Sequence, residues 1–140
     1  SMDSRRAAYR HFVDVAEAAQ QLNCPSTATA AEDYALWLEL RDPETSDNGR
    51  RRLEAKLHDT KSALRLVPLG FQFGIKLDPA AVQQEIERHI AIHGGITQDT
   101  AFACIALEFK QNTSEGVANY IDQHFNELSK YINTKWMRSI

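Results

Sequence analysis

Residues 114–136 read SEGVANYIDQHFNELSKYINTKW and are the longest stretch of the chain with a single periodicity. Apolar side chains recur in it at steps of three and four residues, which places them on one face of a helix with most polar side chains opposite. Ser114 is suited to cap the first turn, and Glu115 lies at the favourable, positive end of the helix dipole. We therefore predict an amphipathic helix over residues 114–136 whose apolar face is covered by other helices.

Helical periodicity recurs through the rest of the chain, so we predict an all-α fold, a compact bundle of about six helices. The ends of one helix are especially clear, because Asp78 and Pro79 suit a helix start and Gly94 suits a helix stop. Ser4 and Thr29 are expected to cap the first and second helices, and Pro68 to end the third. We expect the first five helices over residues 4–22, 29–40, 50–67, 78–93 and 98–110.

Four segments depart from this helical pattern or fit a second structure equally well. Residues 42–49, DPETSDNG, are the most polar and turn-rich part of the chain and are expected to form a surface loop. Residues 69–77, LGFQFGIKL, alternate apolar with polar or glycine positions, which predicts an extended segment. Residues 34–40 and 103–109 fit a helix but also alternate as a half-buried strand does, so the sequence leaves both structures open.

The composition is that of an ordinary globular domain. The 140 residues are 43% hydrophobic and 25% charged, with a net charge of −3 at pH 7, and one core suits this length. The negative charge argues against nucleic-acid binding, which usually needs a basic excess. No apolar run reaches the roughly 20 residues that span a bilayer. We predict a single helical domain over residues 1–140, located in the cytoplasm, with Ser1 a cloning remnant and Cys24 and Cys104 free thiols.

One candidate metal site lies on the helix predicted over residues 78–93. Glu85, His89 and His93 are four residues apart and therefore share one helix face. Two imidazoles one turn apart can reach the same metal ion, and the carboxylate could be a third ligand or orient His89. The alternative interpretation is a solvated helix face whose histidines favour the negative end of the dipole.

A second candidate is RAAYRH in the first helix. Arg6 and His11 have the spacing of the Arg-His motif of the HEPN ribonucleases, and over these six residues the chain resembles that family. The resemblance implies a helical dimer in which His11 acts as a base on a ribose hydroxyl and Arg6 steadies the phosphate. Without this chemistry, the arginines form the solvated face of an amphipathic helix, which we favour.

A third candidate depends on whether residues 103–109 are a strand. Glu108 and Lys110 would then match the Glu-x-Lys half of the PD-(D/E)xK nucleases, in which a carboxylate and a lysine face one metal and one phosphate. A helix over these residues would exclude that resemblance.

The remaining sequence has no Gly-rich phosphate loop and no Cys-His metal spacing, so we expect no cofactor. We favour a small interaction or regulatory module that self-associates over an enzyme. Its partner is then a protein, a second copy included. Trp37 and Trp136 are large anchors for a core or a partner surface. The alternative function is a metal-dependent or HEPN-like enzyme acting on nucleic acid or nucleotides. The residues expected to contact a partner are Phe71, Phe73, Tyr131, Trp136 and Met137.

Overall fold

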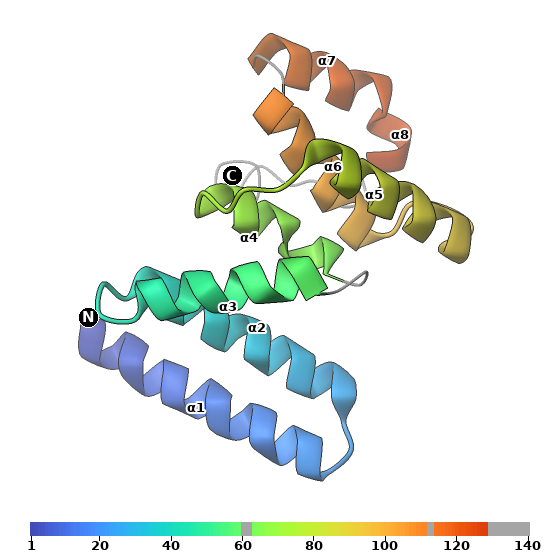
Figure 1. The fold of residues 1–140 in the computed structure, drawn as a ribbon. Helices are drawn as coiled ribbons and strands as arrows, with labels where there is room; N and C mark the ends of the chain where they lie inside the picture. Colours follow the sequence, from blue (N-terminus) through green and yellow to red (C-terminus); the bar gives the residue numbers. More distant parts are fainter. Residues whose placement is uncertain (60–62, 112–113, 129–140) are drawn as a thin grey trace. The chain divides into compact units, whose positions relative to one another are not determined.

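The computed structural model describes residues 1–59, 63–111 and 114–128, and all regular structure in this part is helical (Figure 1). The described helices are α1 (Met2–Gln21), α2 (Pro25–Arg41), α3 (Ser46–Asp59), the 3-10 turn η1 (Leu64–Leu66), α4 (Val67–Gln72), α5 (Pro79–His93), α6 (Gln98–Gln111), α7 (Ser114–Gln123) and α8 (Phe125–Leu128). Six of those α-helices have ten or more residues, which confirms the all-α class and the expected number of helices. The chain divides into two compact units, Ser1–Ala55 and Lys56–Ile140. The single domain stays a prediction, and each unit is described separately.

The first unit begins with two antiparallel helices, α1 and α2, joined by a tight turn (Figure 1). Asn23 sets this turn with a left-handed φ of 59°, and the Cys24 amide donates a 2.8 Å hydrogen bond to the Ala19 carbonyl. Asparagine tolerates this conformation and so ends α1 as glycine often ends a helix. Small side chains between the helices allow their backbones to approach closely. The buried alanines are Ala16, Ala19, Ala28, Ala31 and Ala35.

The C-terminal end of α2 packs against the first turns of α3 through Gly49. A Cβ at this position would lie 3.2 Å from the backbone nitrogen of Leu40 and 3.3 Å from the carbonyl carbon of Glu39, so a side chain would separate the two helices. Leu36 lies one turn before Leu40 on the same side of α2, and both are buried. In the first unit α1 therefore packs along α2, whereas α3 contacts the C-terminal end of α2 at Glu39 and Leu40.

Both helices of this pair start earlier than predicted. The Ser1 hydroxyl accepts a 3.3 Å hydrogen bond from the Ser4 amide, so Ser1, and not Ser4, caps α1. Helix α2 starts at Pro25, whose fixed φ and missing N–H suit the first helical position. Thr29 consequently lies inside the helix and does not cap it.

The loop predicted over residues 42–49 is shorter in the structure, because α3 begins at Ser46. Its tight geometry follows from Asp42, whose Oδ1 accepts a 3.0 Å hydrogen bond from the Glu44 amide. An aspartate that bonds the backbone two residues ahead favours such a turn. The polar composition indicated a loop, but four of its residues belong to the helix.

The second unit is arranged around α6, which contacts η1, α4, α5 and α7. One core cluster joins η1, α4, α5 and α6 through Leu64, Val67, Val82, Ile86, Ala103 and Leu107. A second cluster joins Ala101 and Ile105 of α6 to Leu128 of α8, and Tyr120 of α7 packs against it. Because α6 has neighbours on several sides, apolar residues surround much of it, and this explains why residues 103–109 also fitted a strand.

Helices α5 and α6 lie where the sequence predicts them. Asp78 caps α5 by accepting a 3.1 Å hydrogen bond from the Ala80 amide, and Gly94 ends it with a left-handed φ of 71°. The Thr97 hydroxyl lies 3.4 Å from the Thr100 amide at the start of α6. The expected start and stop residues of α5 are thereby confirmed.

The extended segment predicted over residues 69–77 is wrong in its first part, because residues 69–72 lie in α4, whereas residues 75–77 belong to no helix. Pro68 stands in the first turn of α4, where the absence of its N–H costs no hydrogen bond. Gly74 ends the helix with a φ of 73°, and the Ile75 amide donates a 2.9 Å bond to the Gly70 carbonyl. Pro68 thus stands at the start of a helix instead of ending one, and the single helix predicted over residues 50–67 is represented in the described residues by α3 and η1.

The helix predicted over residues 114–136 is interrupted at His124, between α7 and α8. Hydrogen bonds of the α-helical spacing continue from the His124 amide to Tyr120 at 3.1 Å and from the Leu128 amide to His124 at 2.9 Å. The break is accompanied by burial of Leu128 in the α6 cluster. Periodicity persists across so small a break and does not reveal it. Residues 129–136 lie outside the described residues.

The two segments that fitted either a helix or a strand, residues 34–40 and 103–109, are helical and belong to α2 and α6. The part of the chain that the structure describes contains no strand. None of its helices has both the length and the apolar character needed to cross a membrane.

Candidate functional site

A cluster of charged side chains joins Arg6 of α1 to the turn that follows α2. The Arg6 guanidinium donates to both oxygens of Asp42, at 2.9 and 3.3 Å, and lies 3.3 Å from a carboxylate oxygen of Glu44. The hydrogen bond from Arg6, together with that from the Glu44 amide, lowers the pKa of Asp42 below its ordinary value of 3.8. The same hydrogen bond raises the pKa of Arg6. Arg6 therefore serves as a structural cation that joins α1 to the turn after α2.

Glu39 lies beside this cluster and is buried in the first unit. Its Oε2 atom is 3.4 Å from a guanidinium nitrogen of Arg52, and its carbonyl accepts a 2.9 Å hydrogen bond from the Thr45 hydroxyl. A hollow of about 240 Å³ opens next to it. Arginines contribute part of the wall, which consists of Arg5, Arg6, Tyr9, Arg10, Leu38, Glu39, Asp42, Glu44 and Thr45. Since Arg6 and Arg52 neutralise the acidic groups within the chain, the hollow offers no evident acid and base pair.

His11 does not join Arg6 in this cluster. Residues five apart on a helix point about 140° apart, so the two side chains leave α1 on different sides. The His11 side chain is exposed, and its ring lies edge-on to Phe12 with 5.7 Å between the centroids. A single chain therefore does not bring the two residues of the HEPN-like motif together, and their catalytic role stays a prediction.

The proposed metal ligands share one face of α5 but do not converge. Glu85 accepts a 3.0 Å hydrogen bond from Nε of Arg88 and forms an ion pair with Nη2 of the same guanidinium, while the rings of His89 and His93 lie with centroids 5.7 Å apart. Across residues 1–59, 63–111 and 114–128, no three histidine, cysteine, aspartate or glutamate side chains are placed to hold one metal ion. The helical structure of residues 103–109 also excludes the nuclease resemblance, because Glu108 and Lys110 then point about 160° apart.

An apolar hollow of about 180 Å³ lies in the second unit beside α5. Leu57, Leu64, Val67 and Val82 supply much of its wall, which also includes the ionisable residues His58, Lys76, Asp78 and Glu85. Asp78 caps α5 and Glu85 pairs with Arg88. The volume of the hollow suits a single side chain or a small organic group.

The two described partner-contact candidates are only partly exposed. Phe71 packs against the core of the second unit, and the ammonium of Lys110 lies 5.9 Å from its ring centroid. Phe73 is half-buried at the end of α4. The other three candidates, Tyr131, Trp136 and Met137, lie outside the described residues. Contact of all five with a partner stays a prediction.

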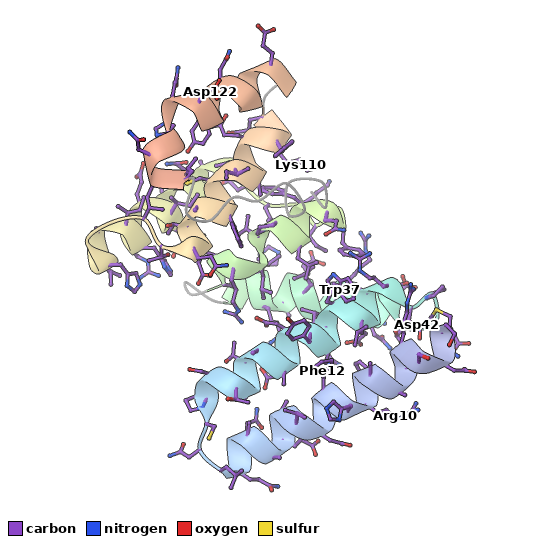
Figure 2. The ribbon with its side chains drawn as sticks, turned by 180° about the vertical axis from the view of Figure 1, so that it is seen from behind. Arg10, Phe12, Trp37, Asp42, Lys110 and Asp122 are labelled. Carbon is purple, nitrogen blue, oxygen red and sulfur yellow. The ribbon has the colours of Figure 1, made fainter. Side chains whose placement is uncertain are left out.

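A different surface lies on the side of α2 opposite its buried residues, and one edge of it borders α1. Five residues at alternating steps of three and four define it, and we call them the α2 stripe: Thr27, Ala30, Tyr34, Trp37 and Arg41. Tyr34 is 59% exposed and Trp37 40% exposed. Figure 2 labels Trp37 on α2 and Phe12 on the neighbouring α1. Four of the five residues are uncharged, whereas the uncovered side of a helix is usually charged or polar.

Neighbouring side chains hold both aromatic residues of the stripe. The Tyr34 ring stacks on Phe12 at 5.1 Å with 17° between the ring planes. The Arg41 guanidinium carbon lies 4.1 Å from the centroid of a Trp37 ring, a cation–π contact. The sequence singled out Trp37 as an anchor. The stripe could not be predicted from the sequence, because α2 is apolar on most sides and only the fold shows which of them are covered.

Comparisons of the chain with family models, with curated proteins and with solved structures gave no match. The function is therefore argued from the residues and their arrangement.

Proposed function

We propose that this protein is a helical interaction module whose contact surface is the α2 stripe. The observation that carries the proposal is that the first four residues of the stripe, Tyr34 and Trp37 among them, are exposed and uncharged on a helix that already packs against α1. Steps of three and four residues are those with which one helix packs against another. The proposed partner therefore presents a helix to α2.

The residue types and their preorganisation support a contact surface. Tryptophan, tyrosine and arginine dominate the energetics of protein interfaces, and all three occur in the α2 stripe. Phe12 and Arg41 already hold Tyr34 and Trp37 in place. Binding then costs less side-chain entropy, since fewer rotamers are lost on contact.

Ion pairs within the first unit also support a contact surface on α2. Arg6 is paired with Asp42 and Arg52 with Glu39, so these residues join α1, α2 and α3 into a scaffold. A stable scaffold presents the stripe with a fixed spacing between its side chains. Binding through the α2 stripe would then require only the stripe and this scaffold from the described part of the chain.

Site-specific photocross-linking tests the proposal without assuming the identity of the partner. A benzoylphenylalanine in place of Tyr34 keeps an aromatic group in the stripe, and the same residue in place of Leu22 is the matched control. Leu22 is 76% exposed but follows α1, outside the stripe. Irradiation in the native host should give a protein adduct from position 34 and none from position 22. Equal yields from both positions, or no adduct from position 34, would contradict the proposal.

A further inference from the structure

We infer that the partner of the α2 stripe is a second copy of this chain, whose α2 helix packs antiparallel to the first about a two-fold axis. The inference rests on the proposed function and adds to it the identity and the orientation of the partner. Three features of the stripe carry it: the order of its side-chain sizes, the position of its charge, and its area.

Side-chain size changes from one end of the stripe to the other. Thr27 and Ala30 are small, whereas Tyr34 and Trp37 are large. In an antiparallel pair centred near residue 32, Tyr34 faces Ala30 of the second copy and Trp37 faces Thr27. Large side chains then fill the space above small ones along the whole contact. A parallel pair would place large side chains against large ones and leave space between the small ones, which costs packing energy.

The position of Arg41 favours the same orientation. Arg41 is the one charged residue of the stripe and stands at its C-terminal end. Parallel helices would bring the two Arg41 side chains together. The antiparallel arrangement separates them by 18 residues along the axis, about 27 Å at a rise of 1.5 Å per residue. Their repulsion is negligible at that distance, which exceeds the roughly 8 Å Debye length at physiological ionic strength. Antiparallel helix dipoles also attract each other.

The available area suits a reversible dimer. Helix α2 has 17 residues and is therefore about 25 Å long. With the adjoining surface of α1 the face is about 20 Å wide, since one helix with its side chains measures about 10 Å across. Each copy then contributes about 500 Å², and the total of about 1,000 Å² is near the lower limit for a specific interface. We accordingly expect a dissociation constant in the micromolar range.

Distances between spin labels distinguish the two orientations. Labels are attached to cysteines that replace Ser26 or Arg41, in a Cys24→Ser background because Cys24 is exposed. The antiparallel dimer predicts axial separations of 12 and 18 residues, which give distances of roughly 20 and 30 Å between copies. The background protein without an added cysteine is the control for labelling at Cys104.

Each outcome bears on a different claim. The expected pair of distances, with the longer one at position 41, supports the antiparallel dimer. Distances under roughly 15 Å at both positions would show a parallel pair and overturn the inference. No distance between copies, together with a photocross-link from position 34 to a different protein, would also overturn it but leave the proposed function standing. Absence of both signals would overturn the two proposals together.

Discussion

Replacement of Trp37 by alanine should weaken the proposed dimer by a predictable amount. Trp37 is 40% exposed, and a tryptophan presents up to about 250 Å², so about 100 Å² per copy remains to be covered by the partner. At about 25 cal/mol per Å², covering it contributes about 2.5 kcal/mol per copy and about 5 kcal/mol per dimer as an upper limit. Alanine retains part of the contact. A rise in the dissociation constant of about 100-fold, equivalent to about 2.7 kcal/mol, is the expected result.

Sedimentation equilibrium over a range of concentrations measures this change. Leu22→Ala is the matched control, because Leu22 is 76% exposed and lies outside the stripe. Its dissociation constant should stay within about twofold of that of the unmodified protein. Far-ultraviolet circular dichroism checks that both variants keep their helices. If Trp37→Ala and Leu22→Ala change the dissociation constant equally, the stripe is not the contact surface.

Three further predictions concern the stability of the fold. Asp42→Asn should destabilise the protein at neutral pH. The pKa of Asp42 is lowered in the folded state, so the ionised carboxylate stabilises the fold at pH above 3.8, and this contribution is lost as the pH falls further. The unfolding free energies of Asp42→Asn and of the unmodified protein should therefore become more similar in acid. Glu44→Gln is the control and should have little effect, because Glu44, the other carboxylate beside Arg6, is 73% exposed. Gly49→Ala should lower the unfolding free energy by up to about 2 kcal/mol, because crowding against Leu40 and Glu39 exceeds the gain in helix propensity. Gly95→Ala has no neighbour within 4 Å of the added Cβ and should leave the unfolding free energy nearly unchanged, as measured by urea unfolding. Ile105→Ala should lower the unfolding free energy by about 2–5 kcal/mol, since Ile105 is fully buried, and a loss below 1 kcal/mol would place it outside the core.

Local signals in the sequence predicted most of the helices. Asp78 and Gly94 marked the two ends of α5, and both act there as expected. The same rules failed at Pro68, because proline ends one helix and begins another equally well, and the choice depends on packing around α4. Tertiary structure decides such boundaries.

The candidate site could be predicted only in part, because its contacts join distant residues. Arg6 was singled out, but its partner Asp42 is 36 residues away and belonged to a segment read only as a polar loop. Trp37 was expected to be an anchor, yet its exposure depends on which sides of α2 are covered by α1 and α3. Periodicity shows that a helix is apolar on several sides but does not show which side stays free.

Hydroxyl-radical footprinting at several protein concentrations tests the central claim most directly, that the α2 stripe is buried when this protein associates. Labelling of Tyr34 and Trp37 is expected to fall as the concentration rises through the dissociation constant. Labelling of Leu22 and of Ile92, which is 63% exposed on α5, should not change. Unchanged labelling of Tyr34 and Trp37 at concentrations where the protein is associated would contradict the claim.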